Sequence, residues 1–257
     1  MQFLKYETQG NLAYITLNRP EKRNAFSFAL VKELKEAFSQ AETDTQVKVV
    51  ILQAEGAVFC AGADLEYLQK LQTLSYEENL EDSMFLKELY AQMYHFPKII
   101  IASVQGHALA GGCGLITVCD FVFAVPEAKF GYTEVKIGFV PAIVMGFLLR
   151  KVGETKAKSL LISGNLIAAK EALEIGLINE VVSHQALTTT VELFAKSLCE
   201  NNSAEAMSMT KKLIAQIQDM PLSVALDVAA TTNASARGTT DCKRGIAAFL
   251  NKEKIVW

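Results

Sequence analysis

IIIASVQGHALAGGCGLITVCDFVFAV, residues 99–125, is a long, nearly uncharged stretch whose interpretation decides the fold class. It is long enough for a membrane-spanning helix. Its middle, however, is rich in glycine, it includes His107 and Asp120, and β-branched residues cluster at both of its ends. Two buried strands with a short buried helix between them explain this pattern better than one spanning helix. We therefore expect a soluble chain that makes no contact with a membrane.

Strands alternate with helices on both sides of this stretch. We expect strands at 12–17, 47–52, 98–104 and 121–125, and helices at 27–42, 76–95 and 112–119. A β–loop–α pattern thus recurs about three times in the N-terminal half of the chain. Such alternation predicts an α/β domain whose sheet is buried on both faces.

The chain from about residue 142 onward is nearly all helical in pattern. Gly153, Gly164 and Gly176 stand where helix ends are expected. No Pro- or Ser-rich linker separates this part from the rest, so it reads as a helical cap on the α/β core. Caps of this kind often build subunit contacts, which predicts a homo-oligomer.

Composition excludes several classes of protein. The chain has 257 residues, a formal net charge of −3 and 51% hydrophobic residues, which is typical of a globular protein. Its acidic balance argues against nucleic-acid binding. The five cysteines are too scattered for a disulfide framework or a zinc site. With no secretory pattern in MQFLKYETQG, residues 1–10, we expect a cytoplasmic protein without a bound metal.

Two glycine-rich segments could point backbone N–H groups outward. They are FCAGADL, residues 59–65, and LAGGCGL, residues 109–115, which leads into the predicted helix. Two such N–H groups, if brought together, make an oxyanion hole. The alternative is that the glycines only allow tight packing between sheet and helix. Neither segment matches a phosphate-binding or dinucleotide-binding fingerprint.

Glu134 is a candidate acid–base group. It lies in AKFGYTEVKIGFVPA, residues 128–142, among apolar and small residues. Desolvation there would favour its protonated form and suit it to proton transfer near neutral pH. The alternative is an exposed carboxylate paired with Lys136.

The order of these segments resembles the enoyl-CoA hydratase/isomerase (crotonase) superfamily over essentially the whole chain. Within it, FGYTEVKIGFVPA resembles bacterial methylglutaconyl-CoA and short-chain enoyl-CoA hydratase-like members. The segments that carry the resemblance are ITLNRPEKRNA (15–25), FCAGADL (59–65), HALAGGCGL (107–115), CDFVFAVPEAKFG (119–131), TEVKIGFVPA (133–142) and GIAAFLNKEKIVW (245–257).

The resemblance implies a ClpP-like spiral of ββα units with a C-terminal helical trimerisation region. We expect the spiral core in residues 1–195 and the helical region in 196–257, assembled as a homotrimer or homohexamer. The implied substrate is an acyl-CoA thioester, and the implied chemistry needs no metal or redox cofactor.

The resemblance also implies roles for individual residues. The oxyanion donors fall on the N–H groups of Ala63 and Gly111, and the acid–base group falls on Glu134. Lys22, Arg23 and a neighbouring subunit's copy of Lys252 are candidates to meet the CoA phosphates; each of the three could equally be a solvated surface cation. The implied substrate-binding positions are Arg23, Ala25, Ala61, Asp64, Leu65, Gly114 and Lys252.

One position departs from the hydratase pattern. Typical hydratases of the family place two glutamates around one water, and the first of these falls here on Gly114. Glu66, Asp64 and His107 are possible replacements, although the two acids fit helix capping better, and a lone histidine is more often structural than catalytic. We expect Gly114→Glu to restore the second carboxylate and to raise hydration, provided that the helix accepts it.

Four functions therefore stay open. The chain could hydrate an enoyl-CoA or shift its double bond. With a single glutamate it could be restricted to 3-enoyl to 2-enoyl-CoA isomerisation, or to a polyketide-type dehydration. A non-enzymatic relative that binds acyl-CoA or RNA is the remaining alternative.

Overall fold

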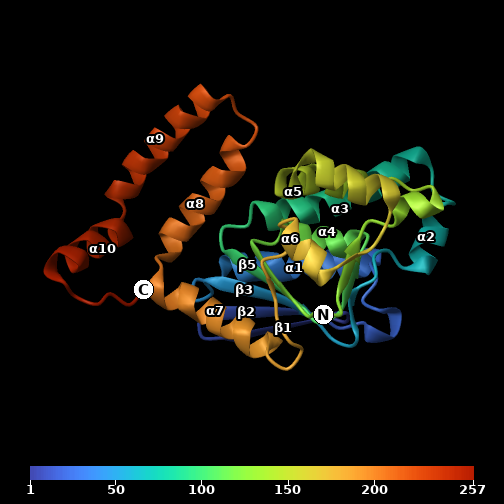
Figure 1. Ribbon diagram of the computed structural model, residues 1–257, viewed down its shortest axis with the longest axis horizontal. Coiled ribbons are helices and arrows are strands. Elements are labelled where there is room, and N and C mark those ends of the chain that lie inside the picture. The colour runs from blue at the N-terminus through green and yellow to red at the C-terminus, as the bar shows by residue number, and fades with distance from the viewer.

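The computed structural model describes residues 1–257 and arranges ten strands in two sheets (Figure 1). The larger sheet has the order β1-β2-β3-β5-β7-β10, and the smaller has the order β4-β6-β8-β9. The strands are β1 (Leu4–Gln9), β2 (Leu12–Leu17), β3 (Val49–Ala54), β4 (Val58–Cys60), β5 (Ile99–Val104), β6 (His107–Leu109), β7 (Phe121–Ala124), β8 (Lys129–Gly131), β9 (Ile167–Ala168) and β10 (Glu180–Val181).

Two layers of helices enclose the larger sheet, as the apolar runs of its strands require. The α-helices are α1 (Phe28–Thr43), α2 (Leu65–Leu71), α3 (Tyr76–Tyr94), α4 (Gly111–Val118), α5 (Ala142–Ser163), α6 (Ala169–Glu174), α7 (Leu187–Asn201), α8 (Ala204–Ile217), α9 (Leu222–Gly238) and α10 (Thr240–Asn251). Helix α1 contacts β1 and β2, and α7 contacts β3, β5 and β7 from the opposite face (Figure 1). No helix combines the length and the apolar character that crossing a membrane would require.

The core of the larger sheet confirms the strands expected from the sequence. β2, β3, β5 and β7 run parallel, and every residue of β5 is buried. Val49–Leu52 of β3 lie beside Ile99–Ala102 of β5, so two apolar runs pack in register. Strand β1, which the sequence analysis did not predict, adds an antiparallel edge to β2.

A second, short strand follows each long strand before the chain enters a helix. β3 leads through β4 to α2, β5 leads through β6 to α4, and β7 leads through β8 to the 3₁₀ turn η2 (Glu134–Ile137). The short strands β4, β6 and β8 pair in parallel and form most of the smaller sheet. The repeating unit is therefore ββα, which confirms the expected spiral; the segments expected as loops contain the second strand of each unit.

The predicted glycine stops are confirmed. Gly153 has a φ of 75° and interrupts α5, and Gly164 ends that helix with a φ of 63°. Gly176 follows α6 with a φ of 77°. These left-handed conformations are readily adopted by glycine and rarely by other residues.

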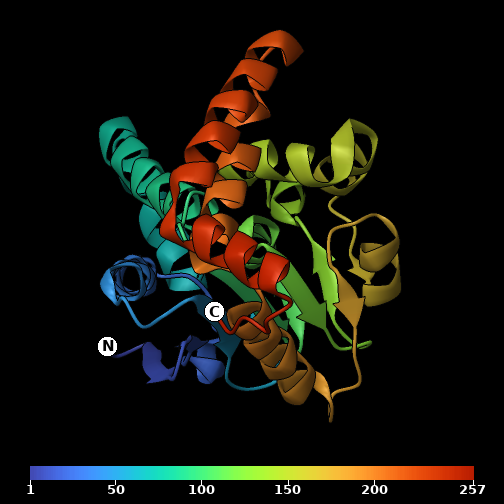
Figure 2. The same ribbon diagram turned by 90° about the vertical axis from the view of Figure 1, so that its left-hand side faces the viewer.

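Helices α8–α10 form a C-terminal arm that projects from the core (Figures 1 and 2). The chain then returns, because the N–H of Trp257 donates to the carbonyl of Glu200 at the end of α7. Several large apolar side chains of the arm are exposed, among them Leu222 (75%) and Phe249 (83%). The expected division between residues 195 and 196 lies inside α7 and remains a prediction.

Candidate active site

Two glycine-containing turns meet at one edge of the smaller sheet. β4 and β6 are parallel, so the residues that follow them, Ala61–Ala63 and Ala110–Gly111, leave the sheet side by side. Gly62 has a φ of 91°, and a Cβ placed on it would lie 2.7 Å from the Cβ of Ala110 and 3.7 Å from the nitrogen of Gly111. Only glycine permits this approach, which brings the two predicted donors together.

The N–H groups of Ala63 and Gly111 are available to a ligand. The flanking segment is fixed, since Phe26 donates to the Gly62 carbonyl and Asp64 donates to the Phe26 carbonyl, but the N–H of Ala63 has no acceptor in the chain. Gly111 is the first residue of α4, and its N–H has no acceptor within the helix. The first hydrogen bond of the helix is donated by the N–H of Gly114 to the carbonyl of Ala110. Two unpaired N–H donors at adjoining turns are the groups from which an oxyanion hole is built.

The structure shows the tight packing that the alternative interpretation of these glycines predicts. A Cβ on Gly112 would lie 2.4 Å from the carbonyl oxygen of Cys60, and one on Gly111 would lie 2.9 Å from the ring of Phe26. The glycines therefore allow α4 to contact β4 and the 26–27 turn closely. That contact is what positions the Gly111 donor.

Glu134 lies at the same edge. β6 and β8 are parallel, and the N–H of Ala110 donates to the carbonyl of Gly131 at 2.8 Å, so the turn that begins with Glu134 lies beside the start of α4. The Oε2 atom of Glu134 is buried without a hydrogen-bond partner, and so it is not paired with Lys136. Burial raises the pKa of Glu134 above its ordinary value, as expected for a proton acceptor kept away from water.

Gly114, by contrast, does not face an open space. It is buried, and a Cβ placed on it would lie 2.4 Å from Cγ1 of Val144 and 2.9 Å from the hydroxyl oxygen of Tyr90. Gly114→Glu would therefore add a second carboxylate only if Val144 and Tyr90 moved, because these side chains fill the space. A role for Gly114 in substrate binding remains a prediction.

None of the three possible replacement acids is free. Asp64 is buried, forms an ion pair with Arg19 at 2.6 Å and caps α2 by accepting from the N–H of Glu66. Glu66 is exposed and forms an ion pair with Lys22 at 2.7 Å. The remaining candidate is His107, whose Nδ1 accepts a hydrogen bond from the backbone N–H of Lys129 at 3.2 Å. One carboxylate, Glu134, is left for chemistry.

The predicted substrate-binding residues fall in two places. Arg23, Ala25, Ala61 and Leu65 lie where the 19–26 loop runs along the 61–64 turn, with the N–H of Ala61 donating to the Arg23 carbonyl at 3.1 Å. Arg23 and Leu65 are exposed there, and Ala25 is buried. Lys252, the exposed residue that ends α10, lies on the C-terminal arm. Their roles in binding remain predictions.

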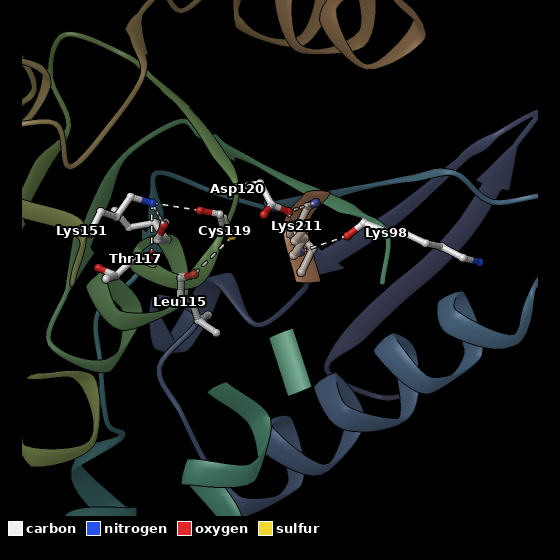
Figure 3. Close-up of polar contacts among 9 residues, drawn as sticks. Lys98, Leu115, Thr117, Cys119, Asp120, Lys151 and Lys211 are labelled. Atoms are coloured by element: carbon white, nitrogen blue, oxygen red, sulfur yellow. Dashed lines mark hydrogen bonds and ion pairs between the residues drawn. The ribbon is translucent and has the colours of Figure 1, made fainter. Parts of the chain in front are cut away.

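The other end of α4 is held by a lysine (Figure 3). Lys151 of α5 donates from Nζ to the carbonyls of Cys119, Thr117 and Ile116 at 2.9, 3.1 and 3.4 Å. Beside it, Lys211 of α8 pairs with Asp120 at 2.6 Å and joins the C-terminal arm to the core. Sequence analysis identified neither lysine, nor Tyr90, because their partners lie far along the chain.

Fold and site together define a class of protein: an α/β spiral in which two backbone donors and one desolvated carboxylate converge. These are the groups needed to polarise a carbonyl group and to move a proton on a neighbouring carbon. Residues 7–257 match the enoyl-CoA hydratase/isomerase family. The chain belongs to that family and is an enzyme that hydrates an enoyl-CoA or shifts its double bond.

Individual relatives agree over nearly their full length. A Thermus thermophilus protein assigned as an enoyl-CoA hydratase is 40% identical over 244 residues, which are 95% of this chain and 96% of the relative. A crystal structure from Legionella pneumophila, assigned as an enoyl-CoA hydratase/isomerase, has a TM-score of 0.89 and 35% identity, covering 98% of this chain and 97% of that one. The enoyl-CoA hydratase of Shewanella pealeana has a TM-score of 0.94 at 29% identity, covering 99% and 96%.

Proposed function

We propose that the protein shifts the double bond of a 3-enoyl-CoA to the 2-position, with Glu134 as its single acid–base group. The observation that carries this proposal is the closed space over Gly114, which Tyr90 and Val144 occupy. Addition of water to a conjugated thioester is served by two carboxylates around one water, and this site offers one. A proton shift between two carbons needs only one.

The reaction follows from the three groups of the site. The thioester oxygen accepts from the N–H groups of Ala63 and Gly111, which stabilise the negative charge as the enolate forms. Glu134 takes the proton from C2, electrons move through the C3–C4 double bond, and Glu134 returns the proton at C4. The C2–H bond breaks, a C4–H bond forms, and the double bond ends between C2 and C3. Each backbone donor contributes roughly 3 kcal/mol to stabilising the charge.

The raised pKa of Glu134 suits this role. A carboxylate that holds a proton more tightly than usual is a stronger base when ionised and can keep the proton until it reaches C4. The enolate forms by loss of a proton, without oxidation or reduction, and backbone donors stabilise its charge. The proposed chemistry therefore draws on no metal or redox cofactor. For the CoA moiety we propose Arg23 together with Lys252 of a second copy as phosphate contacts.

A comparison of substrates tests the proposal. With 3-hexenoyl-CoA we expect conversion to the conjugated 2-isomer, followed by its absorbance, and with crotonyl-CoA we expect little hydration. Reaction in deuterium oxide with the product analysed by mass should show the migrating hydrogen partly retained, because one carboxylate carries it. Hydration of crotonyl-CoA or 3-methylglutaconyl-CoA at a rate equal to the double-bond shift would overturn the proposal.

Hydration is the second candidate function, and the names of the relatives favour it. In that case a water would have to be activated by Glu134 alone. The same comparison separates the two functions, since a hydratase forms a 3-hydroxy product from crotonyl-CoA. That product has lost its conjugated double bond and is distinguished by its absorbance.

We further propose a trimer or hexamer located in the cytoplasm. The C-terminal arm exposes large apolar residues, and a cavity of about 980 Å³ lies between it and the core, lined in part by Phe147, Met207 and Trp257. A second copy that covers this surface would remove it from water. All five cysteines are free, in keeping with a reducing compartment. Light scattering at micromolar concentration should give a trimer or hexamer, and a monomer would contradict it.

A further inference from the structure

Tyr90 is a buried polar side chain that the proposed reaction does not use. It lies on α3, a helix with only three buried residues, and its own exposure is 0%. Its hydroxyl donates to the carbonyl oxygen of Gly111 at 2.8 Å. A Cβ on Gly111 would lie 3.2 Å from the hydroxyl oxygen, so the phenol lies directly against the first turn of α4.

The first turn of α4 needs such a contact. Ala110 caps the helix without a side-chain hydrogen bond and has a φ of 49°, which a residue with a Cβ adopts only at a cost. Gly111, Gly112 and Gly114 follow, and glycine has the greatest backbone freedom of any residue. A turn built in this way does not fix the direction of the Gly111 N–H by its own local preferences.

Tyr90 also lies close to the second feature that sets the chemistry. Its ring and hydroxyl, together with Val144, fill the space over Gly114. Burial raises the pKa of Tyr90 well above its ordinary value, so the phenol stays neutral and keeps its proton for donation. It therefore acts as a permanent donor to the first turn of α4.

We propose that Tyr90 is a positioning residue for the oxyanion hole. By holding the carbonyl of Gly111 it fixes the first turn of α4, so that the Gly111 N–H points at the thioester oxygen, and by filling the space over Gly114 it excludes a second carboxylate. The inference rests on the proposed function only in so far as both assign the Gly111 N–H to the thioester.

Tyr90→Phe tests the proposal, with Tyr94→Phe as its matched control. Phenylalanine keeps the ring that covers Gly114 and removes only the donor. Tyr94 lies one turn further along α3, and its hydroxyl has no partner in the chain, so Tyr94→Phe removes a hydroxyl without a role. Thermal unfolding of both variants establishes that they are folded before activity is compared.

The main readout is spectroscopic. The absorption of para-dimethylaminocinnamoyl-CoA moves to the red when its thioester carbonyl is polarised, and this probe has no C4 hydrogen to shift. We expect Tyr90→Phe to reduce the red shift of the bound probe and to lower kcat on 3-hexenoyl-CoA by about tenfold, less than the loss of a whole oxyanion donor, with KM changed less than about twofold. Tyr94→Phe should match the wild type in all three.

Each remaining outcome is decisive. A wild-type red shift in Tyr90→Phe, or equal losses in both variants, overturns the positioning role. If the wild type fails to isomerise 3-hexenoyl-CoA while Tyr90→Phe still loses the red shift, the proposed function fails and the inference stands, because the spectrum measures polarisation without turnover.

Discussion

The two ends of α4 are built on opposite principles. At the N-terminal end, Gly111 and Gly112 leave backbone donors without a partner or a side-chain cap. At the C-terminal end, Lys151 satisfies three carbonyl groups at once. Both ends of any helix start with unsatisfied groups, so the difference is informative. The end left unsatisfied is the one that we propose binds the thioester oxygen.

Charge follows the same division. The positive charge of Lys151 is favourable at a helix C-terminus, where the carbonyl ends of the dipole gather. Burial lowers the pKa of Lys151, and the neighbouring carboxylate of Asp120 counteracts this. No basic side chain fills the N-terminal turn, whose donors stay free for a developing oxyanion. Perturbing the first end should change the chemistry, and perturbing the second should change stability.

The largest effect is expected from Glu134→Gln, beside the N-terminal end. The variant keeps the volume of the side chain and loses the base, so kcat on 3-hexenoyl-CoA should fall by about 10²–10⁴-fold. The backbone donors of Ala63 and Gly111 are untouched, and the red shift of the bound cinnamoyl probe should stay. Stopped assays of product formation measure kcat, and absorption spectra measure the red shift of the bound probe. Substantial residual turnover would mean that another group carries the proton.

Lys151→Met at the C-terminal end should give the next largest effect, this time on stability. The carbonyls of Thr117 and Cys119 would lose a charged donor, which should lower the free energy of unfolding by about 3 kcal/mol. Urea unfolding measures the change. Lys158→Met on the same helix is the control, because Lys158 forms an exposed ion pair with Glu154 and its loss should change stability by less than about 1 kcal/mol. Equal effects of the two substitutions would contradict the comparison.

Gly114→Ala should give a smaller loss in the middle of α4. Alanine favours a helix by up to about 1 kcal/mol over glycine, but its Cβ would collide with Val144 and Tyr90. Overpacking costs about 1–3 kcal/mol, so we expect a net loss of about 1 kcal/mol in unfolding experiments. Val144→Ala in the same chain should relieve the collision, and the double-mutant cycle should give a favourable coupling of at least about 0.5 kcal/mol. Additive effects would show that the helix moves freely instead.

The sequence was sufficient to predict the long elements because their patterns are local. The apolar run of β5 and the helix starting at Gly111 follow from residues within a few positions of one another. The three-residue strands β4, β6 and β8 are too short to show an alternation of apolar and polar residues, and they form through pairing with one another. Their pairing is set by the spiral, not by local preference.

The candidate site divides in the same way. Ala63, Gly111 and Glu134 were predicted from motifs, whereas Tyr90 and Lys151 were not, although both contact α4. Tyr90 reaches Gly111 across 21 positions and Lys151 reaches Thr117 across 34. On its own helix, a buried tyrosine looks like any core residue, and a lysine looks like a surface cation. Only the tertiary contact shows what each one does.

The smallest predicted effect is the pH dependence of stability at Glu134. The folded pKa of Glu134 is raised by burial, so its stability contribution is fully present below the ordinary glutamate pKa of about 4.3 and is lost as pH rises through the folded pKa. Relative to Glu134→Gln, which does not titrate, the wild type should become less stable over that window and level off above it. Urea unfolding of both chains across the window measures the difference, and a flat difference would contradict the buried base.

The effects of substitution on the stability of the fold then differ in sign between the two ends of α4. Replacing Lys151 by methionine should destabilise the fold because the carbonyl groups that accept from its Nζ lose their donor. Removing the charge of Glu134 should stabilise it at neutral pH, because that carboxylate is kept away from water without a partner on Oε2. The same desolvation suits Glu134 to its proposed role as the base. At the N-terminal end of α4, stability and catalysis therefore have opposite requirements, and at the C-terminal end only stability is at stake.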